Sequence, residues 1–163
     1  MAKQIDDVDA RILELLQADG RMKRNAIAED VGMSVPAVSE RIRKLEERGV
    51  IRGYTAEVDV RRLRYDITAF VRANVDGSEH YANFVEQITA MSAVLEMHSI
   101  TGEGSHMLKM RIPNTDSLER ILSEIQKIEG VSRTRSSIVL STFKETRAVP
   151  VEPMELYDYE STN

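Results

Sequence analysis

The chain has 163 residues, a formal net charge of −5 at neutral pH and no cysteine. These values exclude a disulfide scaffold, a thiolate metal site and a cysteine nucleophile, and the length allows one large domain or two small ones. No apolar run approaches the ~18 residues of a membrane span, so we expect no membrane partner, and the lack of cysteine suits a cytoplasmic location. The charge is uneven: residues 1–65 carry a balance of +1 and residues 66–163 a balance of −6, which suggests two modules with different partners.

The first sixty residues show three helical patterns separated by glycines. Apolar residues at helical spacing predict a first helix within 5–20 and a short second helix over 24–31. Ser34 as N-cap and Pro36 in the first turn predict a third helix that runs to about Arg48. Three helices of this length, with a four-residue turn between the second and the third, predict a helix-turn-helix.

The segment after the third helix is rich in β-branched and aromatic residues. Residues 50–58 therefore predict a strand or a small hairpin wing. The charged stretch 61–66 is the candidate linker. We expect a winged helix-turn-helix domain over residues 1–60.

The second half alternates strand and helix patterns. Period-two and helical apolar repeats follow the order strand, helix, strand, strand, helix, strand, over 67–75, 81–91, 94–101, 106–112, 115–128 and 131–142. This order predicts a ferredoxin-like βαββαβ plait over residues 67–143. The predicted fold class is therefore α+β, with the winged helix-turn-helix first. Residues 144–163 contain two prolines and five acids and predict an extended tail, with strand swapping left open.

The third helix has the two faces that a recognition helix needs. An aliphatic stripe from Val35 to Leu45 is predicted to be buried, and short and charged residues lie opposite. Short residues can approach base edges, and the cations can neutralise phosphates or bind guanine. The predicted DNA-binding residues are Ser34, Val35, Pro36, Ala37, Ser39, Glu40, Arg41, Arg43 and Lys44. Arg41 and Lys44 lie off the stripe, so their removal should weaken DNA binding with little loss of packing.

One other interpretation of this half of the chain stays open. The third helix could be a solvated amphipathic helix in which Glu40 and Lys44 form a plain ion pair. The order of helices and wing favours double-stranded DNA as the partner.

The loop 101–105 joins two predicted strands and places two glycines around an acid. The local sequence is mainly that of a hairpin turn. Its functional interpretation is a set of exposed backbone N–H groups that hold a small carboxylate, helped by hydroxyls of the last strand. The candidate effector-binding residues are Gly102, Glu103, Gly104, Ser105, His106, Thr134 and Ser136.

No catalytic site, metal site or cofactor is predicted. Without cysteine, clustered histidines or a Gly-x-Ser-x-Gly motif, nucleophilic catalysis lacks its groups, which disfavours a small plait enzyme. His98 and His106 would lie on adjacent strands, and Glu96 shares a face with His98. A zinc site needs three or four ligands, and the sequence offers no fourth.

Several runs of the sequence resemble the leucine-responsive/asparagine regulator (Lrp/AsnC) family. They are Asp6-x-x-Asp9-x-x-Ile12-Leu13-x-x-Leu16-Gln17-x-Asp19-Gly20-Arg21, then Val31-Gly32-Met33-Ser34-x-x-x-Val38-x-x-Arg41-Ile42-x-x-Leu45-Glu46-x-x-Gly49-Val50-Ile51-x-Gly53-Tyr54, and in the plait Glu96-Met97-His98-x-x-Thr101-Gly102 with Leu108-Lys109-x-Arg111. The resemblance covers residues 4 to about 145. It implies a DNA-binding regulator of transcription.

The resemblance also implies partners for the plait. In the family, plaits pair face to face through their sheets into homodimers, dimers often form an octamer, and small ligands, usually amino acids, bind between dimers near the loop that corresponds to 101–106. Thr68, Phe70 and Met97 are our candidates for the dimer face.

The chain departs from the family in this loop. The family commonly shows Gly-x-x-Asp-Tyr, and here Ser105 and His106 replace the aspartate and the tyrosine. A neutral hydroxyl binds an ammonium less well than a carboxylate does, so we expect weak amino-acid binding unless Glu103 substitutes, and tighter binding in Ser105→Asp. A ligand-independent architectural protein that wraps DNA is the alternative function.

Overall fold

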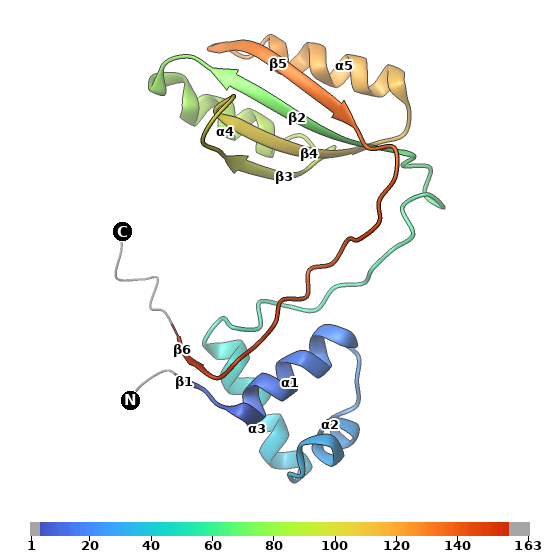
Figure 1. Cartoon of the computed structure of the whole chain (residues 1–163), viewed down its shortest axis with the longest axis vertical. Coiled ribbons are helices and arrows are strands. Elements are labelled where there is room, and N and C mark those ends of the chain that lie inside the picture. Colours follow the sequence, from blue (N-terminus) through green and yellow to red (C-terminus); the bar gives the residue numbers. More distant parts are fainter. Residues whose placement is uncertain (1–3, 157–163) are drawn as a thin grey trace. The chain divides into compact units, whose positions relative to one another are not determined.

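The computed structural model describes residues 4–156, and residues 1–3 and 157–163 lie outside that part, so the predicted tail is described only up to residue 156. The chain forms two compact units (Figure 1). Of the described residues, the first unit combines 4–57 with 145–156, and the second comprises Val58–Lys144. The chain therefore passes from one unit to the other twice.

Three helices make up most of the first unit. They are α1 (Asp7–Ala18), α2 (Arg24–Val31) and α3 (Val35–Glu47). The side chain of Asp6 caps α1 by accepting from the amide of Asp9 at 2.8 Å. Gly32 ends α2 with a φ of 68°, a left-handed conformation that glycine adopts without a Cβ clash, and the chain then turns into α3. Aliphatic side chains from all three helices share one buried core, which confirms the predicted helix-turn-helix.

The strand predicted within residues 50–58 is wrong, because this segment contains no strand. A strand needs a partner for its backbone groups, and none pairs with this segment. Side chains hold its start instead. Val50 and Ile51 pack against the helical core, and the hydroxyl of Tyr54 donates to Glu46 Oε1 at 2.9 Å.

The described part of the tail belongs to the first unit. Strand β6 (Met154–Glu155) pairs antiparallel with β1 (Gln4–Ile5) in a two-stranded sheet. Val151 packs against the helical core. The Gln17 amide bonds the backbone of Val149 twice, at 2.9 Å to its carbonyl and 2.8 Å from its N–H. Backbone pairing with β1, apolar packing on the helical core and the Gln17 side chain of α1 therefore fasten the tail to its own chain.

The second unit is the predicted plait. Its elements are β2 (Ile67–Val75), a short 3₁₀ helix (Ser78–His80), α4 (Tyr81–Thr89), β3 (Val94–Ser99), β4 (His106–Ile112), α5 (Thr115–Gln126) and β5 (Val131–Ile138). The strands form one antiparallel sheet in the order β3-β4-β2-β5. This confirms the ferredoxin-like plait, although β3 and β5 end earlier than predicted.

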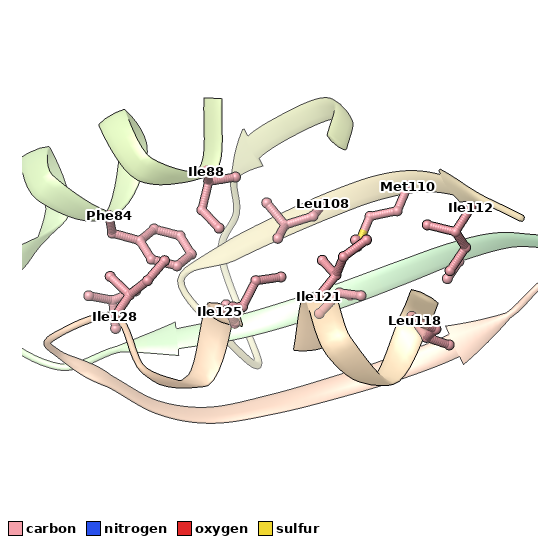
Figure 2. Close-up of a cluster of buried hydrophobic side chains, with 13 residues drawn as sticks. Phe84, Ile88, Leu108, Met110, Ile112, Leu118, Ile121, Ile125 and Ile128 are labelled. Carbon is pink, nitrogen blue, oxygen red and sulfur yellow. The ribbon is translucent and has the colours of Figure 1, made fainter. Parts of the chain in front are cut away.

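One face of the sheet and the two helices enclose the core of the second unit. Figure 2 shows Phe84 and Ile88 of α4, and Ile121 and Ile125 of α5, packed over the sheet. Alternate residues of β2 and β4 are buried on the same side, as the period-two pattern predicts. Leaving such an aliphatic or aromatic side chain exposed would cost roughly 1.5–3 kcal/mol each, so this face fixes the register of the sheet.

The opposite face of the sheet, called here the open face, carries polar side chains around one exposed aromatic residue. Phe70 is 39% exposed, and Thr68 is half-buried on the same side of β2. Met97, predicted to lie with them, does not, because a bulge near the start of β3 shifts the alternation. Met97 pairs with Leu108 and packs against the helix-covered core.

Candidate DNA-binding helix and ligand cavity

Helix α3 is anchored along one side. Val38, Ile42 and Leu45 are each at most 1% exposed. Ser34 accepts the Ala37 amide at 3.4 Å and so begins the helix where the sequence predicts. Val35, predicted to extend the buried stripe, is 41% exposed because it lies in the first turn at the margin of that stripe. The side of α3 opposite the stripe is open to solvent.

An ion-paired group, called here the outward triad, occupies the centre of that open side. It consists of Glu40, Arg43 and Glu47. Arg43 Nε and Nη2 donate to the two carboxylate oxygens of Glu40 at 2.9 and 2.6 Å, and Arg43 Nη1 donates to Glu47. The hydrogen bonds from Arg43 lower the pKa of Glu40 to about 2, so this carboxylate is ionised at neutral pH.

Most of the predicted DNA-binding residues are exposed together on this side of the helix. The exposed ones are Ser34, Val35, Pro36, Ser39, Glu40, Arg43 and Lys44, and Ala37 is half-buried. Arg41 differs from all of these, because its charge is directed at the first helix.

Arg41 links α3 to the start of α1. Its Nη1 donates to Asp6 Oδ2 at 2.7 Å and to Asp9 Oδ1 at 2.8 Å, and the Asp9 side chain is only 10% exposed. Desolvation raises the pKa of Asp6, but hydrogen bonds from the Asp9 amide and Arg41 outweigh it, and the pKa lies below its ordinary value. The expectation that Arg41 could be removed with little loss of packing is wrong, since its partners lie on another helix.

A hollow of about 320 Å³ lies beside α3. It is lined by Asp9, Met33, Ala37, Glu40, Arg41, Lys44, Leu45 and Arg48. Lys44 lies 3.6 Å from Glu40, and Arg48 Nη1 donates to the Gln4 carbonyl at 3.3 Å. The contacts of both cations are longer than the two ion pairs of Arg41, so both can approach a phosphate oxygen.

A second cavity, of about 400 Å³, lies in the plait at the end of β2. Its lining consists of Asn74, Val75, Asp76, Tyr81, Ser99, Ile100, Gly102, Gly104 and Ser105. Three of the predicted effector residues are therefore together here. Gly104 has a φ of 90°, and a Cβ at this position would lie 3.3 Å from Asn74 Oδ1, so glycine lets the loop backbone lie close to β2.

The other predicted effector residues lie elsewhere. Glu103 Oε2 accepts from Arg135 at 2.8 Å. Thr134 accepts from Gln126 of α5 at 2.7 Å, and Ser136 shares this helix-facing side of β5; the lining above includes neither. His106 is 1% exposed, and its ring contacts Tyr81 of the cavity lining.

The hydroxyl of Ser105 is used within the protein. Its Oγ accepts from the Val75 amide at 3.0 Å and lies 3.2 Å from the Ala73 carbonyl and 2.9 Å from His106 Nδ1. A carboxylate at this position would face the Ala73 carbonyl without a proton to donate. Ser105→Asp would exchange these contacts for a carboxylate, and its tighter amino-acid binding stays a prediction.

The sequence interpretation missed the residues that the end of β2 and the following turn bring to the cavity. Asn74 and Asp76 offer an amide and a carboxylate, and Tyr81 adds an aromatic ring. The Asp76-Gly77 pair that follows a period-two strand was the available signal, because polar residues at strand ends often line sites.

The two histidines on neighbouring strands face opposite sides of the sheet. His98 lies on the open face, 3.6 Å from Glu96, whereas His106 is buried. Over residues 4–156 no group of three or more histidine, aspartate or glutamate side chains is placed to hold a metal ion. Within the same range no helix is long and apolar enough to cross a bilayer.

Arg41→Ala is predicted to destabilise the first unit by about 1.5–3 kcal/mol, because the carboxylate of Asp9 would stay buried without its charged donor. Urea unfolding followed through the NMR signals of α1 and α3 measures this. Arg43→Ala is the matched control, since its partners are exposed and its loss should shift the unfolding midpoint far less. Equal unfolding midpoints for the two variants would contradict the assignment.

The stability of the second unit should depend on the protonation of His106. Burial lowers the pKa of His106 below its ordinary value of 6.5. The unfolded chain then binds a proton at a higher pH than the folded chain does, so stability is complete above pH 6.5 and declines as the pH falls below it. Melting curves of the plait between pH 7.5 and 5.5 should show this decline.

The decline should shrink in His106→Phe, which keeps an aromatic ring beside Tyr81 and Phe84. His98→Gln, at an exposed position, serves as the control and should melt as the wild type does. A decline of the same size in His106→Phe would rule out His106 as its source.

Two family models match the chain. Residues 5–52 match a winged helix-turn-helix DNA-binding model, and residues 68–149 match the Lrp/AsnC ligand binding domain. The HTH-type transcriptional regulator FL11 of Pyrococcus furiosus is 34% identical over 148 residues, which is 91% of this chain and 97% of FL11. The leucine-responsive regulatory protein of Escherichia coli is 28% identical over 153 residues, or 92% and 93% of the two chains.

A solved structure of a transcriptional regulator is also similar to this chain. The complex of a Neisseria meningitidis transcriptional regulator with L-Met has a TM-score of 0.86 to this chain at 26% identity. The match covers 89% of this chain and 96% of that one.

Proposed function

The chain belongs to the Lrp/AsnC family of transcriptional regulators, and from this membership we propose that α3 enters the major groove of double-stranded DNA. The observation that carries the proposal is the division of α3 into a buried stripe and an exposed polar side that begins at its N-terminus. In this arrangement the exposed residues between Ser34 and Lys44 approach the bases. Arg41 positions the helix from behind, and Lys44 and Arg48 bind phosphates. The relatives are transcriptional regulators, and we propose no enzymatic activity.

We propose further that the plait forms a homodimer through the open face. Two helices cover one face of the sheet, so the other face, with Phe70 39% exposed, is available to a second copy. A two-fold dimer presents two recognition helices, which suits a pseudo-palindromic site with half-sites about one helical turn apart. Assembly of dimers into octamers, which the resemblance implies, and a cytoplasmic location complete the proposal.

The cavity of about 400 Å³ is our proposed effector site, with an amino acid as the ligand. Its loop supplies backbone N–H groups for the carboxylate of the amino acid. Asp76 supplies a carboxylate for the ammonium of the amino acid, whereas Ser105 has only a hydroxyl. The Neisseria meningitidis relative was crystallised with L-Met, which supports this ligand class. An effector that binds one assembly more tightly than another shifts the population towards it.

A ligand-independent architectural protein is the second candidate function, and the altered loop 102–106 favours it. Calorimetry of the full chain against the twenty amino acids separates the two. Heat of binding for one or more amino acids supports the regulator with an effector. No heat for any of them supports the architectural protein.

Lys44→Ala is predicted to weaken binding to DNA sequences that the wild-type chain selects from a random pool. If Lys44 neutralises one phosphate, the slope of log K against log salt should fall by about 0.9. Lys127→Ala, at the exposed end of α5, is the matched control and should leave both values unchanged. Identical salt dependence for Lys44→Ala and the wild type would remove Lys44 from the DNA interface.

A further inference from the structure

Arg43 is held from two directions on the exposed side of α3. Glu40 lies one turn before it and Glu47 one turn after it, and the three side chains are each about half exposed. Single exposed ion pairs are weak, but an arginine that is bidentate to one carboxylate and bonded to another belongs to a network with defined geometry. The guanidinium of Arg43 is therefore oriented before any DNA arrives.

The hydrogen bonds within the outward triad leave a particular pair of donors unused. An arginine side chain carries five N–H donors. Glu40 takes one from Nε and one from Nη2, and Glu47 takes one from Nη1. One N–H therefore remains on each terminal nitrogen, and a fork of two N–H donors is what binds O6 and N7 of guanine in the major groove.

The charge of the outward triad also indicates that recognition of bases and attraction of phosphates fall to different residues. One guanidinium between two carboxylates gives the triad a net charge of −1, so it repels phosphates. Lys44 and Arg48 lie beside the hollow and supply attraction to the DNA backbone. Arg43 is thus poorly suited to bind a phosphate while its fork remains available to a base.

We propose that Arg43 is the guanine-reading residue of α3 and that Glu40 and Glu47 are its positioning residues. The inference rests on the proposed function, in which α3 enters the major groove. Helix α3 contains two arginines, and the other, Arg41, is bonded to Asp6 and Asp9 of the first helix. Lys44 is a point charge without a fork, so it cannot discriminate guanine in the same way.

Selection from a random DNA pool, followed by affinities for the selected site with each of the four bases at its preferred guanine, tests the reading role. The wild-type chain should prefer guanine at one position in each half-site. Arg43→Met keeps an unbranched side chain and removes every N–H donor, so this preference should fall roughly tenfold or more. Replacing that guanine by 7-deazaguanine removes the N7 acceptor, so it should weaken wild-type binding and leave Arg43→Met unaffected.

Glu40→Gln and Glu47→Gln test the positioning role. Each removes a negative charge and keeps the side-chain length, so affinity for all sequences should rise while the preference for guanine falls. A merely structural residue would not move these two quantities in opposite directions. Glu119→Gln on α5 is the control and should change neither.

Three results would overturn the inference. An intact guanine preference in Arg43→Met removes Arg43 as the reader. Higher affinity with an unchanged preference in both glutamine variants removes the positioning role. Loss of a cytosine preference in Glu40→Gln, with the guanine preference kept, makes Glu40 a reader itself. If the wild-type chain selects no DNA, the proposed function itself fails. The three results above require selected DNA, so they overturn the inference about Arg43 alone.

Discussion

The ion pair between Arg41 and Asp9 sets the orientation on which the DNA-binding interpretation depends. Burial of Val38, Ile42 and Leu45 holds α3 against the other helices, but an aliphatic stripe alone tolerates some rotation about the helix axis. A charged hydrogen bond of 2.8 Å from Arg41 to the nearly buried carboxylate of Asp9 opposes this rotation. With Arg41 fixed towards α1, the outward triad is placed on the side that faces solvent.

The second unit depends on a comparable constraint. The hydroxyl of Ser105 joins the loop to β2 and to His106, and this fixes one wall of the 400 Å³ cavity. The loop therefore departs from the family pattern and still contacts β2, and Asp76 of the neighbouring turn lines the same cavity. The two units are connected both by residues 58–66 and by the segment before Glu145, so the DNA-binding unit is attached at two points of the chain.

Elements that depend on their own periodicity could be predicted from the sequence. The boundaries of α2, β2 and β4 agree with the sequence patterns because each element buries one regular face. Features that depend on a distant partner could not. The segment 50–58 has strand composition but no strand to pair with, and the partner of Arg41 lies 32 residues away on α1. Met97 lies on the helix-covered face instead of the predicted open face because of a bulge in β3, and the spacing of apolar residues does not indicate that bulge.

The central claim is that the exposed side of α3 lies against the bases of bound DNA. The chain has no native cysteine, so Ser39→Cys and Ser123→Cys each carry one photo-crosslinker, on α3 and on α5 respectively. With DNA selected by the wild-type chain, we predict that irradiation joins position 39 to bases within the selected site and leaves position 123 unattached. Crosslinks from position 123 without any from position 39 would contradict the account.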